Sequence, residues 1–341
     1  MQELALVGID LGKHTFHLHG QDASGRQVFR KKIGRSQVLA FCSRLPACTI
    51  AMEAGGGAHF MARQIALLGH QVKLISPRFV RPFVKSIKND FMDAEAICEA
   101  ASRPSMRFVT PKSESQQSLS ALHRTRQSLM QERIRTGNQI HAFLLEFGIV
   151  MPRGTDIKKR LAAVLAEHDL PAPMMTLLLR LRDHSEYLRN QIMGIEKELS
   201  AQLSTDELAQ RLLTVPGIGP ITASALIGEM GDGLQFACGR DFAAWLGLVP
   251  QQISTGGKTT LRGVSRREGK PIRTLLVLCA RSYILRVNKE SGRLADWVRS
   301  LMARRHANIV ACALANKLAR IAWAVATKKA PFQPYPSVMP G

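Results

Sequence analysis

Cysteine is scarce and scattered in this chain. The six cysteines form no Cys-x-x-Cys pair and no Cys/His cluster at the spacing of zinc ligands; they are Cys42, Cys48, Cys98, Cys238, Cys279 and Cys312. This spacing argues against a disulfide framework and against a structural zinc site. We therefore expect a protein of the reducing cytoplasm.

A long uninterrupted apolar run is also missing. The N-terminus carries no basic segment ahead of the short apolar stretch that ends at Asp10, so we expect no secretory signal. The best candidate for a membrane span, residues 307–326, is interrupted by Asn, Lys and Arg, whereas a spanning helix needs about 20 mostly apolar residues. We predict a packed helix there and no membrane partner.

Aromatic residues make up only 6% of the chain, too few for long platforms on which nucleic-acid bases stack. The chain is, by contrast, rich in positively charged residues. Its 341 residues include 47 Lys and Arg against 26 Asp and Glu, a formal net charge of +21. With 45% hydrophobic residues, 26 Gly and 16 Pro, the composition predicts a folded protein of two or three domains and excludes collagen-like or wholly disordered chains.

The basic excess is concentrated in two segments. Residues 250–341 hold 17 Lys and Arg against three acids, and residues 54–89 hold six basic residues and no acid. Such fields attract polyanions, of which nucleic acid is the commonest large one. A solvated surface or attraction to anionic lipid would give the same count, but no amphipathic Lys/Trp helix of the interfacial kind is present. We therefore expect nucleic acid, held mainly through its backbone.

Strand and helix patterns alternate in the first hundred residues. Strand-like runs at 4–10, 15–19 and 27–33 form a meander, followed by a helix near 36–44, a strand at 48–53, a helix at 58–68, a strand at 71–76 and a helix at 90–102. The order βββαβαβα predicts an α/β domain, residues 1–104, whose mixed sheet has helices on its faces.

Helical patterns dominate residues 105–205. Leucine and isoleucine recur at three- and four-residue steps in residues 181–203, a heptad-like stripe, and residues 119–147 supply a partner helix. Breakers at 148–154 and 170–173 mark the bend of a long helical hairpin. Plain packing and a dimerising or domain-spacing arm explain this stripe equally well.

The last part, residues 206–330, is predicted to be a mostly helical domain, with a Pro-rich tail at 331–341. Between two helices, Val215-Pro-Gly-Ile-Gly-Pro220 is typical of a helix-hairpin-helix turn, in which Gly217 and Gly219 let backbone N–H groups approach a phosphate. An ordinary tight turn is the simpler alternative. Residues 250–269 are predicted to form an ordered Gly/Ser/Thr/Arg-rich loop, and two long helices near 271–287 and 291–328 complete the fold.

Four carboxylates are the candidates for a catalytic site. Asp10 and Glu53 each end a predicted strand, where open α/β sheets place ligand-binding groups. Asp90 and Asp93 lie three residues apart, on one face of a helix start. Together they can hold one or two Mg²⁺ ions, and two metals about 4 Å apart stabilise both the attacking and the leaving oxygen of a phosphodiester. Helix capping would explain Asp90 alone, but not the ordered set of four.

Basic and hydroxyl side chains accompany these carboxylates. Lys85 and Lys88 directly precede the third of them and could hold a nucleic-acid backbone beside the metal. The segment Ser254-Thr-Gly-Gly-Lys258, with Arg262 and Arg266 after it, combines a hydroxyl with cations that would stabilise charge on a transferring phosphate. The same residues are also typical of a plain turn, and their spacing is not that of a Walker loop.

Three histidines, His14, His17 and His19, lie near Asp10 in the sequence. On the second predicted strand, His17 and His19 share a face. We interpret them as polar residues of the sheet face and assign them no catalytic role.

In their order along the chain, these motifs resemble those of the DEDD transposases of bacterial insertion sequences, the IS110 family with its IS1111 subgroup, which also includes the Piv DNA invertases. The matching segments are Val7-Gly-Ile-Asp10-Leu-Gly-Lys13, Met52-Glu53-Ala54, Lys88-Asn-Asp90-Phe-Met-Asp93-Ala-Glu-Ala96, Val215-Pro-Gly-Ile-Gly219, Ser254-Thr-Gly-Gly257 and Gly263-Val-Ser265. The resemblance covers nearly the whole chain. It implies a RuvC-like, ribonuclease-H-fold N-terminal domain, a coiled-coil arm and a C-terminal transposase domain that carries a Ser.

The resemblance also implies roles for individual residues. Asp10, Glu53, Asp90 and Asp93 would be the metal-binding tetrad, and Ser254 would form a covalent phosphoserine link to DNA; Thr255 would take that place if the loop lengths differ. Members of the family act as dimers or tetramers with composite sites, and several use a structured bridge RNA to select target and donor DNA. The expected place of action is the bacterial nucleoid.

Other functions remain open at this point. A RuvC-like nuclease would hydrolyse DNA junctions with metal-activated water and would need no Ser. The segment Gly8-Ile-Asp-Leu-Gly12 also resembles the first phosphate loop of actin-like ATPases and sugar kinases, but no second Asp-x-Gly loop follows. A DNA-binding protein without catalysis would use the carboxylates only structurally.

Overall fold

The computed structural model describes residues 3–84, 90–152, 154, 156–265 and 269–334. The chain divides into two compact units, Met1–Ser113 (unit 1) and Glu114–Gly341 (unit 2). Each unit encloses its own clusters of buried apolar side chains. Each therefore has the separate core that an independently folding domain requires.

A six-stranded mixed sheet with the order β3-β2-β1-β4-β5-β6 forms the centre of unit 1. Its strands are β1 (Leu4–Leu11), β2 (Thr15–Asp22), β3 (Gln27–Gly34), β4 (Thr49–Glu53), β5 (Gln71–Ile75) and β6 (Phe108–Val109). The first three strands form an antiparallel meander, whereas β1, β4 and β5 run parallel. The predicted mixed sheet is confirmed; the two-residue β6 was too short for a pattern to indicate.

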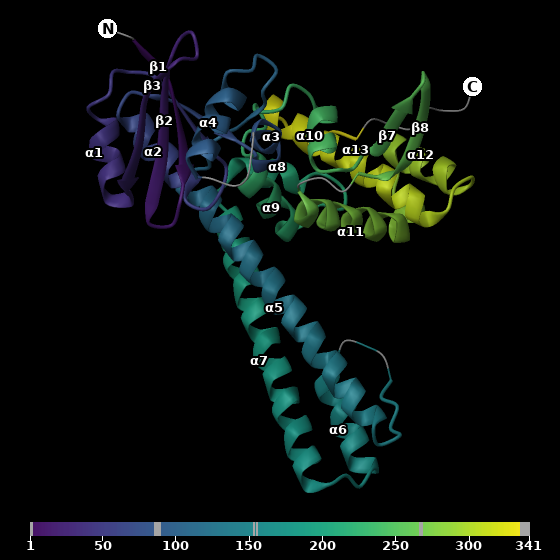
Figure 1. The fold of residues 1–341 in the computed structure, drawn as a ribbon. Helices are drawn as coiled ribbons and strands as arrows, with labels where there is room; N and C mark the ends of the chain where they lie inside the picture. Colours follow the sequence, from purple (N-terminus) through teal and green to yellow (C-terminus); the bar gives the residue numbers. More distant parts are fainter. Residues whose placement is uncertain (1–2, 85–89, 153, 155, 266–268, 335–341) are drawn as a thin grey trace, which may run out of the picture. The chain divides into compact units, whose positions relative to one another are not determined.

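Helices cover both faces of this sheet (Figure 1). They are η1 (Arg35–Gln37), α1 (Val38–Cys42), α2 (Ala58–Leu67), α3 (Pro77–Val80), η2 (Arg81–Phe83) and α4 (Asp90–Ala101). Along β1, Val7 and Ile9 pack with α1 and α2, while Leu6 packs with α4 on the opposite face. This alternation places Gly8 and Asp10 on the α4 face as well.

Unit 2 begins with a long antiparallel helical hairpin, α5 (Glu114–Leu145) and α7 (Ala172–Leu203), which Figure 1 shows side by side. Arg126 on α5 donates to Glu196 on α7, with 2.7 Å between Nε and Oε1. At the far end, α6 (Ile157–Glu167) packs into an apolar cluster with both helices. The hairpin is confirmed, but α6 lies where the sequence predicted only a bend.

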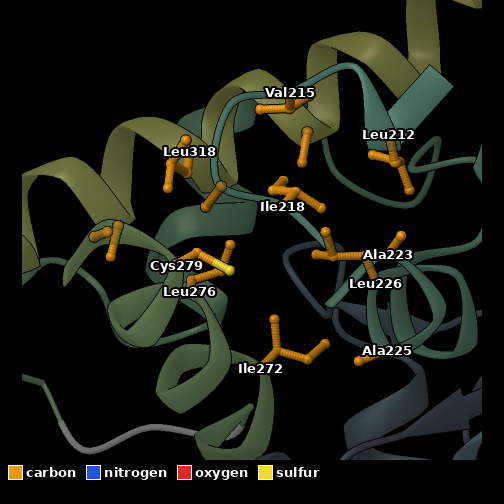
Figure 2. Packing of buried hydrophobic residues seen from close by; sticks show 14 of the residues in the cluster. Leu212, Val215, Ile218, Ala223, Ala225, Leu226, Ile272, Leu276, Cys279 and Leu318 are labelled. Carbon is orange, nitrogen blue, oxygen red and sulfur yellow. The ribbon is translucent and has the colours of Figure 1, made fainter. Parts of the chain in front are cut away.

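The remaining helices of unit 2 share one apolar core. They are α8 (Glu207–Leu213), α9 (Pro220–Met230), α10 (Gly239–Trp245), α11 (Lys270–Arg286), η3 (Val287–Lys289), α12 (Arg293–Met302) and α13 (Ala307–Lys328). Leu119, Leu199 and Leu203 of the long hairpin belong to the same core. Figure 2 shows part of it, with Val215 and Ile218 of the turn between α8 and α9 beside Cys279 of α11 and Leu318 of α13.

Two predictions for the C-terminal part were wrong. Residues 250–269 are not a loop throughout, because β7 (Pro250–Thr255) and β8 (Lys258–Val264) pair as a hairpin. Gly256 and Gly257 have φ of 57° and 74°, which a tight two-residue hairpin turn requires. The single helix expected over 291–328 is two, α12 and α13, because His306 is extended and its side chain accepts a hydrogen bond from the Asn308 backbone.

Among the residues that the structure describes, one helix, α13, is long and apolar enough to cross a membrane by length and composition alone. Half of its most apolar stretch is buried inside the protein. Val310, Leu314 and Leu318 lie in the core of unit 2, and Lys317 and Arg320 interrupt the apolar sequence. These contacts are those of the packed core helix that the sequence predicted.

Candidate active site

Three of the four predicted carboxylates lie together at one end of the sheet in unit 1. One carboxylate oxygen from each of Asp10, Asp90 and Asp93 lies within 4.8 Å of the other two. Asp10 is the last residue but one of β1, and the two others occupy the first turn of α4. Residues 80 positions apart in the sequence therefore meet at the carboxyl end of β1.

Glu53 lies beside this group. On the parallel pair β1 and β4, Ile9 lies opposite Met52, so Asp10 and Glu53 follow at the same level. Burial raises the pKa of Glu53, and the charges of Asp10 and then Asp93 raise it further. These shifts indicate that Glu53 shares the negative field of the other carboxylates.

A glycine brings α4 close to β1. A Cβ atom on Gly8 would lie 2.3 Å from the carbonyl oxygen of Ala94 and 2.8 Å from the sulfur of Cys98. The Cys98 thiol also donates to the His19 carbonyl oxygen on β2, at 3.3 Å. Since Ala94 follows Asp93 directly, this close packing sets the approach of the helix carboxylates to Asp10. The motif at residues 7–13 was identified in the sequence, but the positioning role of Gly8 was not.

His17 is a neighbour that sequence reasoning missed. It is buried on β2 opposite Asp10, and its Nδ1 lies 3.7 Å from Oδ2 of Asp90. Its ring meets Phe91 edge-on, with 4.7 Å between the centroids. The prediction of a polar sheet-face residue therefore left out a contact with a candidate ligand. The alternation of β2 placed His17 on a face, but only the position of α4 brings Asp90 to it.

The donor set fits a divalent cation. Carboxylate oxygens are the hard ligands that Mg²⁺ and similar ions prefer, and three of them come from different parts of the fold to one place. Mutual repulsion within such a cluster is relieved when a cation binds, and this repulsion adds to burial in raising the pKa of Glu53. Residues Asp10, Asp90 and Asp93 can therefore hold a metal ion.

The predicted nucleophile belongs to unit 2. Ser254 is exposed on β7, opposite Thr259, with 3.4 Å between the two hydroxyl oxygens. Gln252, on the same face, donates from Nε2 to the Ser254 hydroxyl oxygen at 3.2 Å. Thr255 follows on the opposite face of the strand. Both hydroxyl groups lie on an exposed hairpin that can present them to a large substrate.

Five basic side chains near the carboxylates and Ser254 in the sequence were predicted to contact nucleic acid. Lys258 begins β8 and Arg262 lies further along it, and both are exposed. Lys85, Lys88 and Arg266 lie outside the described residues.

The two glycines of the turn between α8 and α9 differ in backbone conformation and in surroundings. Gly217 has φ of +83°, and a Cβ there would lie 3.1 Å from the carbonyl oxygen of Cys279. Packing against α11 therefore accounts for this glycine. Gly219 has an ordinary extended backbone, and a Cβ there would meet nothing within 4 Å. Nothing in the described fold requires glycine at position 219. A glycine here is instead what the predicted phosphate contact would need, so Gly219 is the residue at which that prediction can be tested.

Over nearly its whole length, the chain is similar to proteins named as transposases. It is 59% identical over 332 residues to the transposase for insertion sequence element IS1328 of Yersinia enterocolitica, covering 97% of this chain and 99% of that protein. A probable family 20 transposase of Pseudomonas aeruginosa is 45% identical, with coverage of 97% and 99%. The transposase for insertion sequence element IS1111A of Coxiella burnetii is 36% identical, with coverage of 98% and 92%.

Two family models match separate parts of the chain. A transposase family of the DEDD type, named for IS110, matches residues 7–149, which include all four carboxylates. The family described as transposase IS116/IS110/IS902 matches residues 209–295, which include Ser254. This similarity disagrees with the sugar-kinase alternative and with a protein that has no catalysis. The chain therefore belongs to the IS110 family of insertion-sequence transposases, enzymes that cut and rejoin DNA.

Proposed function

We propose that the chain cuts and rejoins DNA strands with Mg²⁺ held by Asp10, Glu53, Asp90 and Asp93 and with Ser254 as the nucleophile. The observation that carries this proposal is the meeting of three aspartate oxygens within 4.8 Å at the end of β1. Glu53, whose pKa is raised by burial and then by Asp10 and Asp93, completes the proposed tetrad. One or two ions are compatible with four carboxylates.

Unit 1 is, in this proposal, a ribonuclease-H-like domain of the RuvC type. The sheet order β3-β2-β1-β4-β5-β6, with an antiparallel meander followed by parallel strands, supports it. The position of α4 across the face that carries Asp10 and Glu53 supports it as well. In the same proposal, residues 1–104 form the catalytic domain, 105–205 the arm and 206–330 the C-terminal transposase domain.

The chemistry divides between the two units. When bound, Mg²⁺ supplies Lewis-acid stabilisation of charge on the oxygens of the phosphodiester. The carboxylates fix the position of that charge, and His17 beside Asp90 helps to orient one of them. Ser254 supplies the attacking oxygen from the exposed hairpin.

The proposed strand transfer conserves the number of phosphate esters. The Ser254 oxygen forms a bond to phosphorus and loses its proton, while the bond from phosphorus to the 3′ oxygen breaks and that oxygen gains a proton. The 5′ phosphate then remains on Ser254. Attack by the 3′ hydroxyl of another strand reverses these events and restores the free serine.

The proposal also takes its binding partners from the family to which the chain belongs. Donor and target DNA are the substrates, and a bridge RNA selects them. The protein acts as a homodimer or homotetramer, with the α5–α7 hairpin as its dimerising or spacing arm. The exposed cations Lys258 and Arg262 on β8 contact nucleic acid beside the reacting phosphate.

Covalent trapping tests the nucleophile. The full-length protein, purified with its nucleic acid, is incubated with labelled donor and target DNA and MgCl₂, then denatured and run on a gel. We expect a protein–DNA adduct with wild type and with Thr255→Ala, and none with Ser254→Ala. Asp10→Asn removes a metal ligand and is also expected to abolish the adduct.

Other outcomes assign the reaction differently. An adduct that persists in Ser254→Ala and disappears in Thr255→Ala would move the nucleophile to Thr255. Cutting and rejoining by Ser254→Ala without any adduct would favour a nuclease that uses water. Adduct formation by Asp10→Asn at the wild-type rate would contradict the metal site.

A further inference from the structure

Unit 2 contains a groove of about 1320 Å³ at the base of the β7–β8 hairpin. Its walls come from the start of α10, the residues before and within the hairpin, α12 and one face of α13. The groove is separate from the carboxylate site, all of whose residues belong to unit 1. Arg262, proposed above to contact nucleic acid, is among the residues that line it.

Five basic side chains line this groove, and among the described residues no acidic side chain does; the five are Arg240, Arg262, Lys317, Arg320 and Lys328. None of the five has a carboxylate partner within the described structure. Arginines elsewhere in unit 2 do have one: Arg299 donates to Asp296 at 2.6 Å. A group of cations without counter-ions at a concave surface fits an anionic ligand from outside.

Lys317 is the cation whose surroundings most clearly favour an anionic ligand. It is half-buried, and its ammonium lies 4.2 Å from the centre of the Trp297 ring. Burial lowers the pKa of Lys317, and the nearby Arg320 lowers it further. The face of an aromatic ring compensates a buried charge only in part. A phosphate between Lys317 and Arg320 would supply the missing negative charge.

Apolar side chains line the groove together with its cations. They include Leu248, Val264, Ile309 and Ile321, as well as the ring of Trp297. A duplex offers a protein mainly phosphates and the edges of stacked bases. An unpaired strand offers phosphates and exposed base faces, and the base faces pack on aromatic and apolar surfaces. Cations beside apolar side chains and two indoles, those of Trp297 and Trp323, therefore fit an unpaired strand better than a duplex.

The groove also continues into the hairpin that carries the proposed nucleophile. Pro250 at the start of β7 lines it, as do Arg262 and Val264 on β8. Ser254 lies four residues after Pro250 on the same strand, about 13 Å away along an extended chain. A strand held in the groove would therefore run toward Ser254, which favours DNA over RNA as its occupant.

We propose that this groove binds an unpaired segment of the DNA strand that Ser254 attacks, with its phosphates on Lys317 and Arg320 and a base against Trp297. The inference rests on the proposed function for its choice of DNA. Melting of a few base pairs next to the cleavage position would supply the unpaired segment.

Binding of a short oligonucleotide tests the groove without any chemistry. Fluorescein-labelled dT15 is titrated with the full-length protein in EDTA, and anisotropy gives Kd at several salt concentrations. We expect Lys317→Met, which keeps the apolar stem, to weaken dT15 binding about tenfold and to lower the salt slope by about 0.7. Trp297→Leu should weaken it about tenfold with an unchanged salt slope.

A matched control removes the same charge elsewhere in unit 2. Arg304 is exposed between α12 and α13 and does not line the groove. Arg304→Ala should bind dT15 within about twofold of wild type. A 15-base-pair duplex should bind Lys317→Met and Arg304→Ala equally well. Far-UV circular dichroism verifies that Trp297→Leu folds, and Lys317→Met carries the test if it does not.

Three results would overturn the inference. Unchanged dT15 binding by Lys317→Met would remove the groove as a DNA site, and equal losses for dT15 and duplex would leave only a general charge effect. Tighter binding of rU15 than of dT15, with the same dependence on Lys317, would assign the groove to RNA. Because no covalent step is measured, failure of Ser254 to form an adduct would refute the proposed function and leave the groove result standing.

Discussion

A Cβ atom on Gly8 would lie 2.3 Å from the carbonyl oxygen of Ala94, so α4 lies as close to β1 as a backbone without a side chain allows. Asp93 immediately precedes Ala94, and Asp10 lies two residues after Gly8 on the same face of β1. The smallest residue in the strand thus sets the distance between carboxylates from two elements. This relationship makes Gly8 a positioning residue for the proposed metal site.

Gly8→Ala is therefore expected to separate α4 from β1. Overpacking of this kind typically destabilises a fold by about 1–3 kcal/mol, and a displacement of about 1 Å at a catalytic group can lower a rate about 100-fold. We expect adduct formation to fall at least about 100-fold while the protein still folds. Gly56→Ala is the matched control, because a Cβ at Gly56 would meet nothing within 4 Å. Equal activity of the two variants would contradict this role for Gly8.

Glu53→Gln is expected to stabilise unit 1 in the absence of metal. The pKa of Glu53 is raised by burial and then by Asp10 and Asp93. A raised pKa gives stability that is present below the pKa of the unfolded chain and is lost as pH rises through the folded value. At pH 7.5 the ionised Glu53 therefore destabilises the fold, and a neutral amide removes that penalty.

Hydrogen exchange followed by mass spectrometry can measure this locally. In EDTA at pH 7.5, peptides that cover β4 should exchange more slowly in Glu53→Gln than in wild type. MgCl₂ should slow exchange in wild type more than in the variant, because a bound cation neutralises the same repulsion. Adduct formation should be lost in the variant. Faster exchange of Glu53→Gln in EDTA would show that Glu53 stabilises the fold by another contact.

Sequence reasoning predicted the four carboxylates because its rules are local. Asp10 and Glu53 follow from the ends of strands, and Asp90 and Asp93 from helical spacing. His17 did not follow, since its contact with Asp90 depends on how α4 crosses the sheet. The positioning role of Gly8 depends on the same crossing. Contacts between distant elements were thus the part that local patterns left undetermined.

The C-terminal errors have a similar origin. Gly256 and Gly257 are a hairpin signal, but the flanking strands are almost wholly exposed and polar, so no alternation of apolar residues marks them as strands. The break between α12 and α13 contains neither glycine nor proline, and His306 caps the second helix with its side chain. The hairpin strands thus have the composition of a loop, and the helix break lacks the residues by which helix ends are usually recognised.

The two glycines of the α8–α9 turn should respond differently to the same substitution. Gly217→Ala is expected to destabilise unit 2, because residue 217 has a positive φ and approaches the Cys279 carbonyl oxygen. Gly219→Ala should fold normally, since its backbone is extended and a Cβ has free space. If a phosphate approaches this turn, Gly219→Ala should weaken binding of duplex DNA several-fold. Urea denaturation and anisotropy measure the two effects, and wild-type affinity of Gly219→Ala would remove the phosphate contact.

His123 should make the stability of unit 2 depend on pH. Its Nε2 lies 2.9 Å from the Ser224 hydroxyl oxygen on α9. Burial, helped by the charge of Arg126 and opposed by Glu229, lowers the pKa of His123 from 6.5 to about 4. The unfolded chain therefore binds the proton more readily between pH 6.5 and 4. The stability from neutral His123 is complete above 6.5 and is lost as pH falls through that window.

Tryptophan fluorescence can follow this loss, because the three tryptophans, Trp245, Trp297 and Trp323, all lie in unit 2. Between pH 7 and pH 4.5 we expect the lowered pKa of His123 to reduce the free energy of unfolding of the wild type by about 1–2 kcal/mol. This figure is already reduced for partial exposure. His123→Gln keeps an amide near Ser224 and cannot gain a charge, so the urea midpoint of this variant should fall less over the same range. Parallel pH dependence of the two proteins would show that His123 takes up its proton without disturbing the contact between α5 and α9.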